Sequence, residues 1–386
     1  MKTFQNLPDI TGKRIIIRVD FNVPLDENGN VREDKRIQHA LPTLRYLLEA
    51  GASQLVLMTH VGRPKNNEPN LKTDKIAAYL QSLLNIEVAK IDDWGEGGVP
   101  TSKIVMLENL RFNPAEKSKK ESERDLFGKQ LASLADFYVN EAFSNSHREH
   151  ASMTSVPKFI PGFAGLGVEK EVNSIKKAIQ NPEHPLVAII GGLKADKLPA
   201  IDYLMNVADH ILVAGALAFT LRKAQGVNVG SSKVDEEGME ELASLVEKIT
   251  QSNKVLLPED AVVADTFDEK ANHKIVQIDQ IEEGWMALDI GPKTIEKYSP
   301  YLQSAKTILW FGPIGVFEME PFANGTRVIA RAMAESPAIT IIGGGDSAGA
   351  VSQLGLEEKM TLVSTGGGAS LQMIEGKKLP AIEILK

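Results

Sequence analysis

Basic side chains in the first 150 residues recur directly after short apolar runs of the kind that form buried strands. Nine of the twelve arginines and four of the seven histidines lie in this part of the chain. Four apolar runs, at residues 15–17, 55–58, 104–107 and 137–139, are followed in turn by Arg18, Asp20 and Asn22, by His60 and Arg63, by Glu108, Asn109 and Arg111, and by His147, Arg148 and His150. Because ligands of open α/β sheets bind beyond the carboxyl ends of the strands, we expect these groups to meet at one site. Arg36, in the connection after the first run, can join them.

The residue types in this group suit a small anionic ligand. Guanidinium groups bind carboxylates and phosphates through two parallel hydrogen bonds, and Asp20 and Asn22 add partners for a hydroxyl group. Alternation with period two predicts Arg18, Asp20 and Asn22 on one face of a strand that Pro24 ends. A single arginine is more often a surface salt bridge, and His60 taken alone could be a core histidine. The prediction therefore depends on the recurrence of basic groups at four strand ends.

Glycine clusters in the second half follow strand-like runs and precede helix-like segments. They are Gly191-Gly192, Gly343-Gly344-Gly345 and Gly366-Gly367-Gly368. Bare backbone amides at a helix N-terminus form a cradle for phosphate, so three clusters in one half predict a nucleotide site. Asp346, after the second cluster, is either the N-cap of its helix or a ligand of Mg²⁺, and the residues alone leave both readings open. Lys194 and Lys197, after the first cluster, either neutralise phosphates or are simply solvated.

Alternation of apolar runs with amphipathic segments predicts βαβ units around buried parallel sheets. With 386 residues the chain exceeds the size of one core, so we expect two domains. Val168, Val172, Ile175 and Ile179 share one face of a predicted helix at residues 168–180, which Asn181-Pro182 ends. We place the domain junction near residues 160–185. The charge run at residues 117–124 is expected to be a solvated helix face.

Composition and missing motifs exclude several classes of protein. The net charge of −8 argues against a nucleic-acid binder, and the chain has no cysteine for disulfides or thiolate sites. No run of about 18 apolar residues and no leader sequence are present, which predicts a cytoplasmic protein without membrane contacts. The glycine motifs of P-loop enzymes and Rossmann dehydrogenases, the protein kinase signatures and zinc-ligand spacings are missing as well.

Taken together, the motifs resemble phosphoglycerate kinase, in order along essentially the whole chain. The segments similar to the family's substrate motifs are Arg18-Val19-Asp20-Phe21-Asn22-Val23-Pro24, His60-Val61-Gly62-Arg63-Pro64, Glu108-Asn109-Leu110-Arg111-Phe112 and His147-Arg148-Glu149-His150-Ala151-Ser152. The segments similar to its nucleotide motifs are Leu288-Asp289-Ile290-Gly291-Pro292-Lys293-Thr294, Gly312-Pro313-Ile314-Gly315-Val316-Phe317-Glu318 and the stretches at 343–347 and 364–371. The resemblance implies a glycolytic phosphotransferase with a carboxyl group as acceptor. The reaction is reversible transfer from 1,3-bisphosphoglycerate to MgADP, which gives 3-phosphoglycerate and MgATP.

The resemblance also implies roles for individual residues. Those implied to bind 3-phosphoglycerate are Asp20, Asn22, Arg36, His60, Arg63, Arg111 and Arg148. Those implied to bind the nucleotide are Lys197, Gly291, Glu318, Gly344, Gly345, Asp346 and Ser347, with Glu318 on the ribose hydroxyls and Asp346 on Mg²⁺. Arg36, Lys197, Gly345 and Gly367 are implied to stabilise the phosphoryl group in flight.

The fold implied is α/β, with two doubly wound parallel-sheet (Rossmann-like) domains joined by a hinge helix and a ligand cleft between them. The N-terminal, 3-phosphoglycerate-binding domain is expected at residues 1–165 plus 370–386, and the C-terminal, nucleotide-binding domain at 166–369. In-line transfer then requires the domains to close, with hinges expected near residues 160–185 and 366–375. The enzyme is expected to be a monomer whose partners are small-molecule substrates.

Several positions depart from the family pattern, mostly in the nucleotide half. Phe311 stands where Asn is usual, Ala214 replaces a glycine and Leu362 a histidine, and the turn between Lys194 and Asp196 is one residue shorter. Glu141 and Ser144 replace an Asp and a Gly in the first half. These departures are the best support for the alternative function, a non-catalytic or altered-specificity nucleotide-binding protein of the same fold. The complete set of substrate arginines favours the enzyme.

Overall fold

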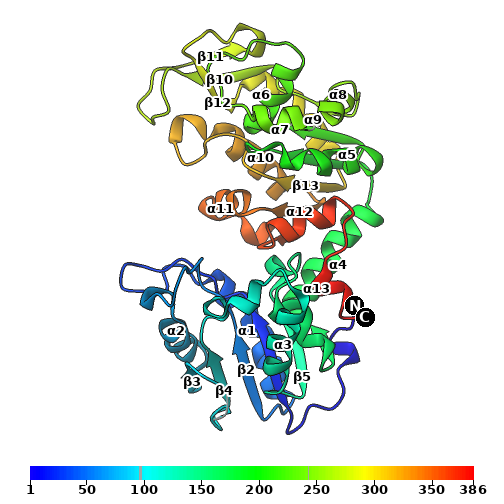
Figure 1. Cartoon of the computed structure of the whole chain (residues 1–386). Coiled ribbons are helices and arrows are strands. Elements are labelled where there is room, and N and C mark those ends of the chain that lie inside the picture. Colours follow the sequence, from blue (N-terminus) through cyan, green and yellow to red (C-terminus); the bar gives the residue numbers. More distant parts are fainter. Residues whose placement is uncertain (95–97, 242) are drawn as a thin grey trace. The chain divides into compact units, whose positions relative to one another are not determined.

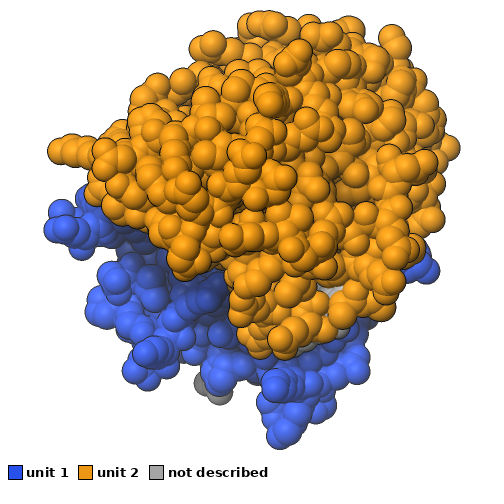
Figure 2. All heavy atoms as spheres, turned by 90° about the horizontal axis from the view of Figure 1, so that it is seen from above, with its two compact units in different colours: residues 1–172, 378–386 blue, residues 173–377 orange. Residues whose placement is uncertain are grey.

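The computed structural model describes residues 1–94, 98–241 and 243–386, which divide into two compact units. Unit 1 comprises residues 1–172 and 378–386, and unit 2 comprises residues 173–377 (Figure 2). The predicted domain boundaries, after residue 165 and before residue 370, stay predictions.

Unit 1 is built on a six-stranded parallel sheet with the strand order β3-β4-β2-β1-β5-β6 (Figure 1). The strands are β1 (Arg14–Val19), β2 (Gln54–Met58), β3 (Val88–Ile91), β4 (Ile104–Leu107), β5 (Phe137–Glu141) and β6 (Gly162–Ala164). The central strands β2 and β4 are buried at every position, as expected for a parallel sheet covered on both faces. The helices are α1 (Lys35–Glu49), α2 (Asp74–Leu84), α3 (Glu121–Ala132), the first part of α4 (Leu166–Gln180) and α13 (Pro380–Glu383).

Unit 2 is built on a second six-stranded parallel sheet with the order β15-β14-β13-β7-β8-β9. Its strands are β7 (Leu186–Ile190), β8 (His210–Val213), β9 (Val255–Leu256), β13 (Thr307–Phe311), β14 (Ile339–Gly343) and β15 (Leu362–Val363). Its helices, besides the end of α4, are α5 (Leu198–Val207), α6 (Gly215–Ala224), α7 (Glu236–Glu241), α8 (Ala243–Thr250), α9 (Pro292–Ser304), α10 (Asn324–Glu335), α11 (Gly345–Gln353) and α12 (Gly368–Ile374). Two helix-flanked parallel sheets confirm the predicted α/β class.

A small antiparallel sheet in unit 2 was not expected from the parallel pattern. It has the order β11-β10-β12 and consists of β10 (Asp260–Ala264), β11 (His273–Gln277) and β12 (Met286–Ile290). The edge strand β11 is partly exposed throughout, so its sequence lacks the continuous apolar run that marks the buried strands.

Helix α4 contains the boundary between the units, after Val172. The predicted apolar face is confirmed, because Val168, Val172, Ile175 and Ile179 are all buried. The chain then returns to unit 1 at its C-terminal end, where Lys2 N–H donates to the carbonyl of Leu385 at 2.5 Å and the two termini lie side by side (Figure 1).

Two local predictions were wrong. The first strand ends at Val19 rather than near Pro24, because its neighbours β2 and β5 end at Met58 and Glu141 and offer no ladder partner beyond that point. The charge run at 117–124 is not one solvated helix face. Helix α3 begins only at Glu121, and Arg124 is buried with Nη1 donating to the carbonyl of Ser118 at 2.8 Å.

No helix in the described part of the chain is both long and apolar enough to span a membrane.

Candidate active site

The basic segments of the first half follow four strands that are direct neighbours in the sheet of unit 1. In the order β4-β2-β1-β5, these strands end just before Glu108, Thr59, Asp20 and Ala142. All four run parallel, so their carboxyl ends lie along the same edge of the sheet. The topology therefore brings the predicted substrate segments together.

Asp20 and Arg36 form the first part of the site. Arg36 Nη1 lies 2.9 Å from Asp20 Oδ2 and 3.1 Å from the carbonyl oxygen of Asn22. Ser144, one of the departures from the family pattern, donates its hydroxyl to the same Asp20 oxygen. The other oxygen, Oδ1, is buried and accepts no hydrogen bond from any described residue. A buried acceptor without a donor is costly, so Oδ1 is suited to a donor supplied by a ligand.

The turn at Gly62 joins three of the predicted segments. Asn22 Oδ1 accepts from Gly62 N–H at 2.8 Å, and Arg111 Nη1 donates to the Gly62 carbonyl at 2.6 Å. Asn109 holds the preceding residue, since its amide bonds both the N–H and the carbonyl of Val61 at 3.1 and 2.8 Å. Gly62 has φ +61°, a backbone conformation that favours glycine over residues with a side chain. Side chains thus fix the positions of His60 and Arg63 relative to Arg111.

The arginines of this cluster face one another. The pKa of Arg111 is lowered to about 10, first by burial and then by the positive charges of Arg148, Arg18 and Arg63. Burial likewise lowers the pKa of Arg148, with Arg18 and Arg63 adding to the shift. Arg111 Nε is buried without a hydrogen-bond partner among the described residues. Like charges this close repel each other, and a bound anion relieves that repulsion.

His60 and Arg63 differ in their surroundings. Arg63 is exposed and free to reach a ligand, whereas His60 is only 3% exposed. Burial lowers the pKa of His60 strongly, and Arg18, Arg111 and Arg148 lower it further. His60 is therefore a neutral imidazole. The pKa of His150 is lowered to about 3 for the same reasons, burial first.

The spacing of the sequence predicts Arg18 on the same strand face as Asp20 and Asn22, and the family resemblance implies no ligand contact for it. The structure buries it completely. Its Nε donates to Ser152 Oγ at 2.9 Å, and its Nη2 lies 2.9 Å from His60 Nδ1. Ser152 in turn donates to the fully buried Glu116. The sequence analysis did not identify Glu116 or Ser152, although Ser152 is the last residue of the motif that begins at His147.

The glycine clusters of unit 2 lie at the carboxyl ends of its parallel strands. Gly191 follows β7, Gly312 follows β13, Gly344 follows β14, and Gly366 lies three residues beyond β15. These loops are joined by backbone bonds: Gly191 N–H donates to the Phe311 carbonyl at 2.7 Å, and Gly192 N–H donates to the Pro313 carbonyl at 2.8 Å. The loops therefore share one edge of the sheet.

The loop before α11 has the geometry of a phosphate cradle. Gly344 is the N-cap with φ +95°, and a Cβ built on Gly345 would meet no atom of the described residues within 4 Å. Asp346 is exposed in the first turn and is not the N-cap, which excludes one of its two sequence-based readings. Ser347 is fully buried, and its hydroxyl accepts from Gly312 N–H at 2.8 Å.

Lys197 and Gly367, the two residues of unit 2 with a predicted role in transfer besides Gly345, differ in their surroundings. Lys197 ends the short helix η8 (Ala195–Lys197), and its Nζ lies 2.9 Å from the position that a Cβ on Gly192 would take. The missing side chain of Gly192 leaves room for this ammonium group. Gly367 has φ +50° with no atom of the described residues within 4 Å of an added Cβ, so its backbone is open to a ligand.

The surroundings of Gly291 and Glu318 give less support to their predicted roles in nucleotide binding. A Cβ on Gly291 would lie 2.3 Å from the carboxylate of Asp260, which accepts from the N–H groups of Lys293 and Thr294 at the start of α9. Packing therefore accounts for this glycine, and its nucleotide role stays a prediction. Glu318 is exposed in the connection between β13 and α10.

The three substitutions from the family pattern in unit 2 lie on buried positions. Phe311, Ala214 and Leu362 are 2%, 1% and 3% exposed. Phe311 packs across Gly343, where a Cβ would come within 1.9 Å of its ring. The ring therefore lies behind the glycine loop, in the core.

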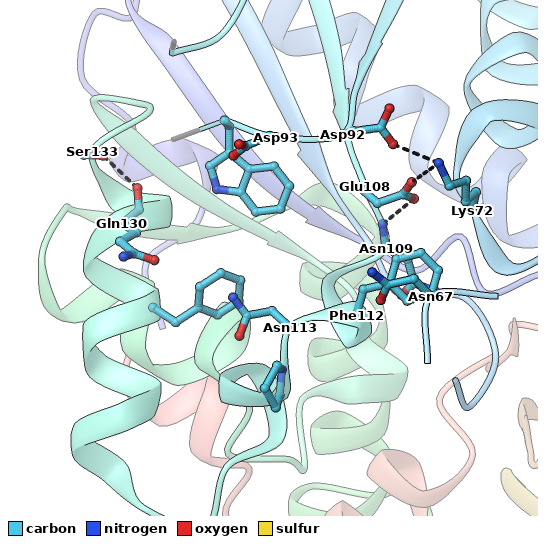
Figure 3. A pocket seen from close by; sticks show the side chains of 13 residues that line it. Asn67, Lys72, Asp92, Asp93, Glu108, Asn109, Phe112, Asn113, Gln130 and Ser133 are labelled. Carbon is cyan, nitrogen blue, oxygen red and sulfur yellow. Dashed lines mark hydrogen bonds and ion pairs between the residues drawn. The ribbon is translucent and has the colours of Figure 1, made fainter. Parts of the chain in front are cut away.

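A separate cavity of about 870 Å³ lies in unit 1 (Figure 3). Its lining includes Lys72, Glu108, Phe112, Asn113 and Gln130. None of the predicted substrate residues is among the described residues that line it. The cavity shares Glu108 and Asn109 with the segment that leads to Arg111, but no arginine is among the described residues that line it.

Comparisons with known proteins identify the family of the chain. The family model described as phosphoglycerate kinase matches residues 4–377. A phosphoglycerate kinase of Herpetosiphon aurantiacus is 45% identical over 393 residues, covering 99% of this chain and 98% of the relative. Phosphoglycerate kinase 3, cytosolic, of Arabidopsis thaliana is 46% identical and covers 97% and 95%.

Solved structures give the same result. The phosphoglycerate kinase of Coxiella burnetii superposes with a TM-score of 0.88 at 37% identity, covering 99% of this chain and 98% of that one. The enzyme of Pyrococcus horikoshii superposes with a TM-score of 0.84 at 30% identity, covering 100% and 98%. Both the sequence and the fold place the chain in the phosphoglycerate kinase family.

Proposed function

We propose that the arginine cluster of unit 1 holds 3-phosphoglycerate and that the glycine loops of unit 2 hold MgATP while the chain carries out the family's reaction. That reaction is the reversible, glycolytic transfer of a phosphoryl group between the acyl phosphate of 1,3-bisphosphoglycerate and ADP. The observation that carries this proposal is the group of mutually repelling, partly buried arginines beside the unpaired oxygen of Asp20.

In unit 1 the proposed substrate contacts divide by chemistry. Arg63, Arg111 and Arg148 match the phosphate of 3-phosphoglycerate, because guanidinium groups bind its oxygens in pairs. Asp20 Oδ1 is an acceptor for the substrate hydroxyl, and Asn22 and His60 complete the site. Arg36, already oriented by Asp20 at 2.9 Å, is the group we assign to the transferring phosphoryl oxygens.

In unit 2 the backbone N–H groups of Gly344, Gly345 and Ser347 are proposed to bind phosphate oxygens, with Lys197 and Gly367 stabilising the charge that develops during transfer. Glu318 is proposed to bind the ribose hydroxyls and Gly291 to line the nucleotide site.

Asp346 is the proposed protein ligand of Mg²⁺. Among the described residues no group of three or more carboxylates and histidines could hold a metal ion. One exposed carboxylate beside a phosphate cradle nevertheless fits Mg²⁺, which is usually held by one or two carboxylates together with phosphates and water. When bound, the ion neutralises charge on the phosphate oxygens.

The reaction needs no general base. The acceptor is a carboxylate, which is ionised at neutral pH, so the protein has to position the two reactants in line and neutralise the three equatorial oxygens. A site made of arginines, one lysine and backbone amides supplies these functions.

A coupled assay with 3-phosphoglycerate and MgATP tests the proposal. Removing one group that stabilises the transition state costs about 100- to 1000-fold in rate, so Arg36→Ala should lose that much of kcat. Arg45→Ala is the matched control, because Arg45 is an exposed arginine of the same helix. Wild type that turns over no faster than Arg36→Ala would favour the non-catalytic alternative.

A further inference from the structure

A buried polar chain in unit 1 links the connections that follow all four strands of the arginine cluster. It runs from Glu116, in the short helix η4 (Pro114–Lys117) beyond β4, to Ser152, in η6 (Ala151–Ser155) beyond β5. It continues to Arg18 on β1 and ends at His60 beyond β2. Glu116, Ser152 and Arg18 are all fully buried.

Each contact in this chain has a defined direction. Glu116 accepts from the Ser152 N–H at 3.0 Å and from the Ser152 hydroxyl at 2.7 Å. The hydroxyl proton is therefore committed to Glu116, and Ser152 Oγ can only accept from Arg18 Nε, at 2.9 Å. Arg18 also donates from Nη1 to the carbonyl of Val19. These bonds leave Arg18 one orientation.

The last contact determines the state of His60. A guanidinium group has donors and no acceptor, so Arg18 Nη2, 2.9 Å from His60 Nδ1, must donate to that nitrogen. Nδ1 is then unprotonated. Because the ring is neutral, Nε2 carries the single proton and is the donor that His60 can present to an anionic ligand.

We propose that Glu116 and Ser152 are positioning residues that act through Arg18 to hold His60 as the Nε2–H tautomer, so that it donates a hydrogen bond to 3-phosphoglycerate. Neither residue touches the substrate. Glu116 accepts two hydrogen bonds from Ser152 and so fixes the Ser152 hydroxyl oxygen as the acceptor for Arg18 Nε, because a buried guanidinium needs acceptors for its donors. The hydrogen bond from His60 to 3-phosphoglycerate rests on the proposed function, whereas the tautomer of His60 does not.

Two variants and a matched control separate this role from general packing. Ser152→Ala leaves Arg18 Nε without its acceptor, and Glu116→Gln replaces one of the two oxygens that accept from Ser152 with a donor while keeping the shape. Ser155→Ala is the control: Ser155 lies in the same short helix, is 1% exposed and donates to the carboxylate of Asp125 at 2.6 Å, outside the polar chain.

The tautomer is read directly from long-range ¹H–¹⁵N correlation spectra of the imidazole rings without substrate, with the His60 signals assigned by their loss in His60→Gln. Wild type and Ser155→Ala should show only Nε2–H. Ser152→Ala and Glu116→Gln should show both tautomers. The same two variants should raise KM for 3-phosphoglycerate about 10- to 100-fold, the range expected for a lost hydrogen bond to a charged group, and leave KM for MgATP unchanged.

Several results would overturn the proposal: an unchanged tautomer in both variants, an equal rise in KM for both substrates, or the same loss in Ser155→Ala. Wild type that binds no 3-phosphoglycerate would instead remove the proposed function, while the tautomer spectra would still decide how the polar chain acts on His60. Urea denaturation of each variant identifies any that does not fold, in which case the other variant decides.

Discussion

The two units form their sites from different kinds of groups, side chains in unit 1 and backbone amides in unit 2. In unit 1 the site consists of side chains that hold one another or the neighbouring loops, such as Arg36 on Asp20 at 2.9 Å and Arg111 on the Gly62 carbonyl at 2.6 Å. In unit 2 it consists mainly of backbone, at glycines such as Gly345 and Gly367, where an added Cβ would meet no atom of the described residues within 4 Å.

This difference bears on the three substitutions from the family pattern in unit 2. A site of side chains depends on the identity of each residue, and the substrate arginines are all present. A site of backbone amides depends on loop conformation, which the core behind it can support with several residue types. Phe311, Ala214 and Leu362 are all buried and belong to that core. We therefore expect the departures to affect stability more than nucleotide binding.

The largest effect is expected at the one side chain that unit 2 is proposed to use in transfer. Lys197→Ala should lower kcat about 100- to 1000-fold, because a group that stabilises the transition state is lost. KM for 3-phosphoglycerate should stay unchanged. Lys194→Ala, three residues earlier and exposed, should stay within about twofold of wild type. Equal losses in both variants, measured by steady-state kinetics, would contradict a special role for Lys197.

The next effect concerns the backbone. Gly344 has φ +95°, so Gly344→Ala should strain the loop by about 1 to 3 kcal/mol and weaken MgATP binding accordingly, measured by isothermal titration calorimetry. Gly349→Ala is the control, since Gly349 lies inside the same helix α11 with ordinary φ and open space around it. That change should stabilise the protein by about 0.5 to 1 kcal/mol. Unchanged MgATP binding by Gly344→Ala would mean that the loop conformation does not matter.

The free energy of unfolding should fall with rising pH, because each unit contains a buried carboxyl group with a raised pKa. Burial raises the pKa of Glu141 to about 8 and that of Asp289 to about 7, and each group accepts from a backbone N–H, of Gly167 and Gly325 respectively. In the unfolded chain both groups ionise near pH 4. Their contribution is thus fully present below that pH and is lost as pH rises through 7 to 8.

The expected slope is at most about 1.4 kcal/mol per pH unit for each group, measured as the free energy of unfolding in urea. Glu141→Gln and Asp289→Asn should each flatten the curve. Glu87→Gln, at the surface of unit 1, should not. Curves of wild type and Glu141→Gln that run parallel between pH 4 and pH 8 would show that Glu141 is ionised in the folded protein.

The smallest effect on binding is expected from Phe311→Leu. The ring is 2% exposed behind the loop, so KM for MgATP should change by less than about twofold, while a thermal unfolding scan should show lower stability. A larger change in KM would mean that the ring contributes to the nucleotide site itself.

Much of this arrangement could be predicted from the chain alone. The apolar runs located the strands β1, β2, β4 and β5 of unit 1, and the apolar face at 168–180 located α4. The antiparallel sheet escaped prediction because its edge strand β11 is partly exposed and short. The sequence identified Arg18 as a basic residue beside Asp20. Period-two spacing could not show that Arg18 is fully buried, or that Asp20, beyond the end of the strand, forms an ion pair with Arg36.

The sequence by itself determined which chemical groups are available: arginines after four strands of one half and glycines after the strands of the other. Only the tertiary structure decided what each group does, because the decisive contacts join residues far apart in the chain. Arg18 and Ser152 are separated by 134 positions, and Arg18 and His60 by 42. No local pattern encodes such a contact, and it is this pair of bonds that leaves the ring proton of His60 on Nε2.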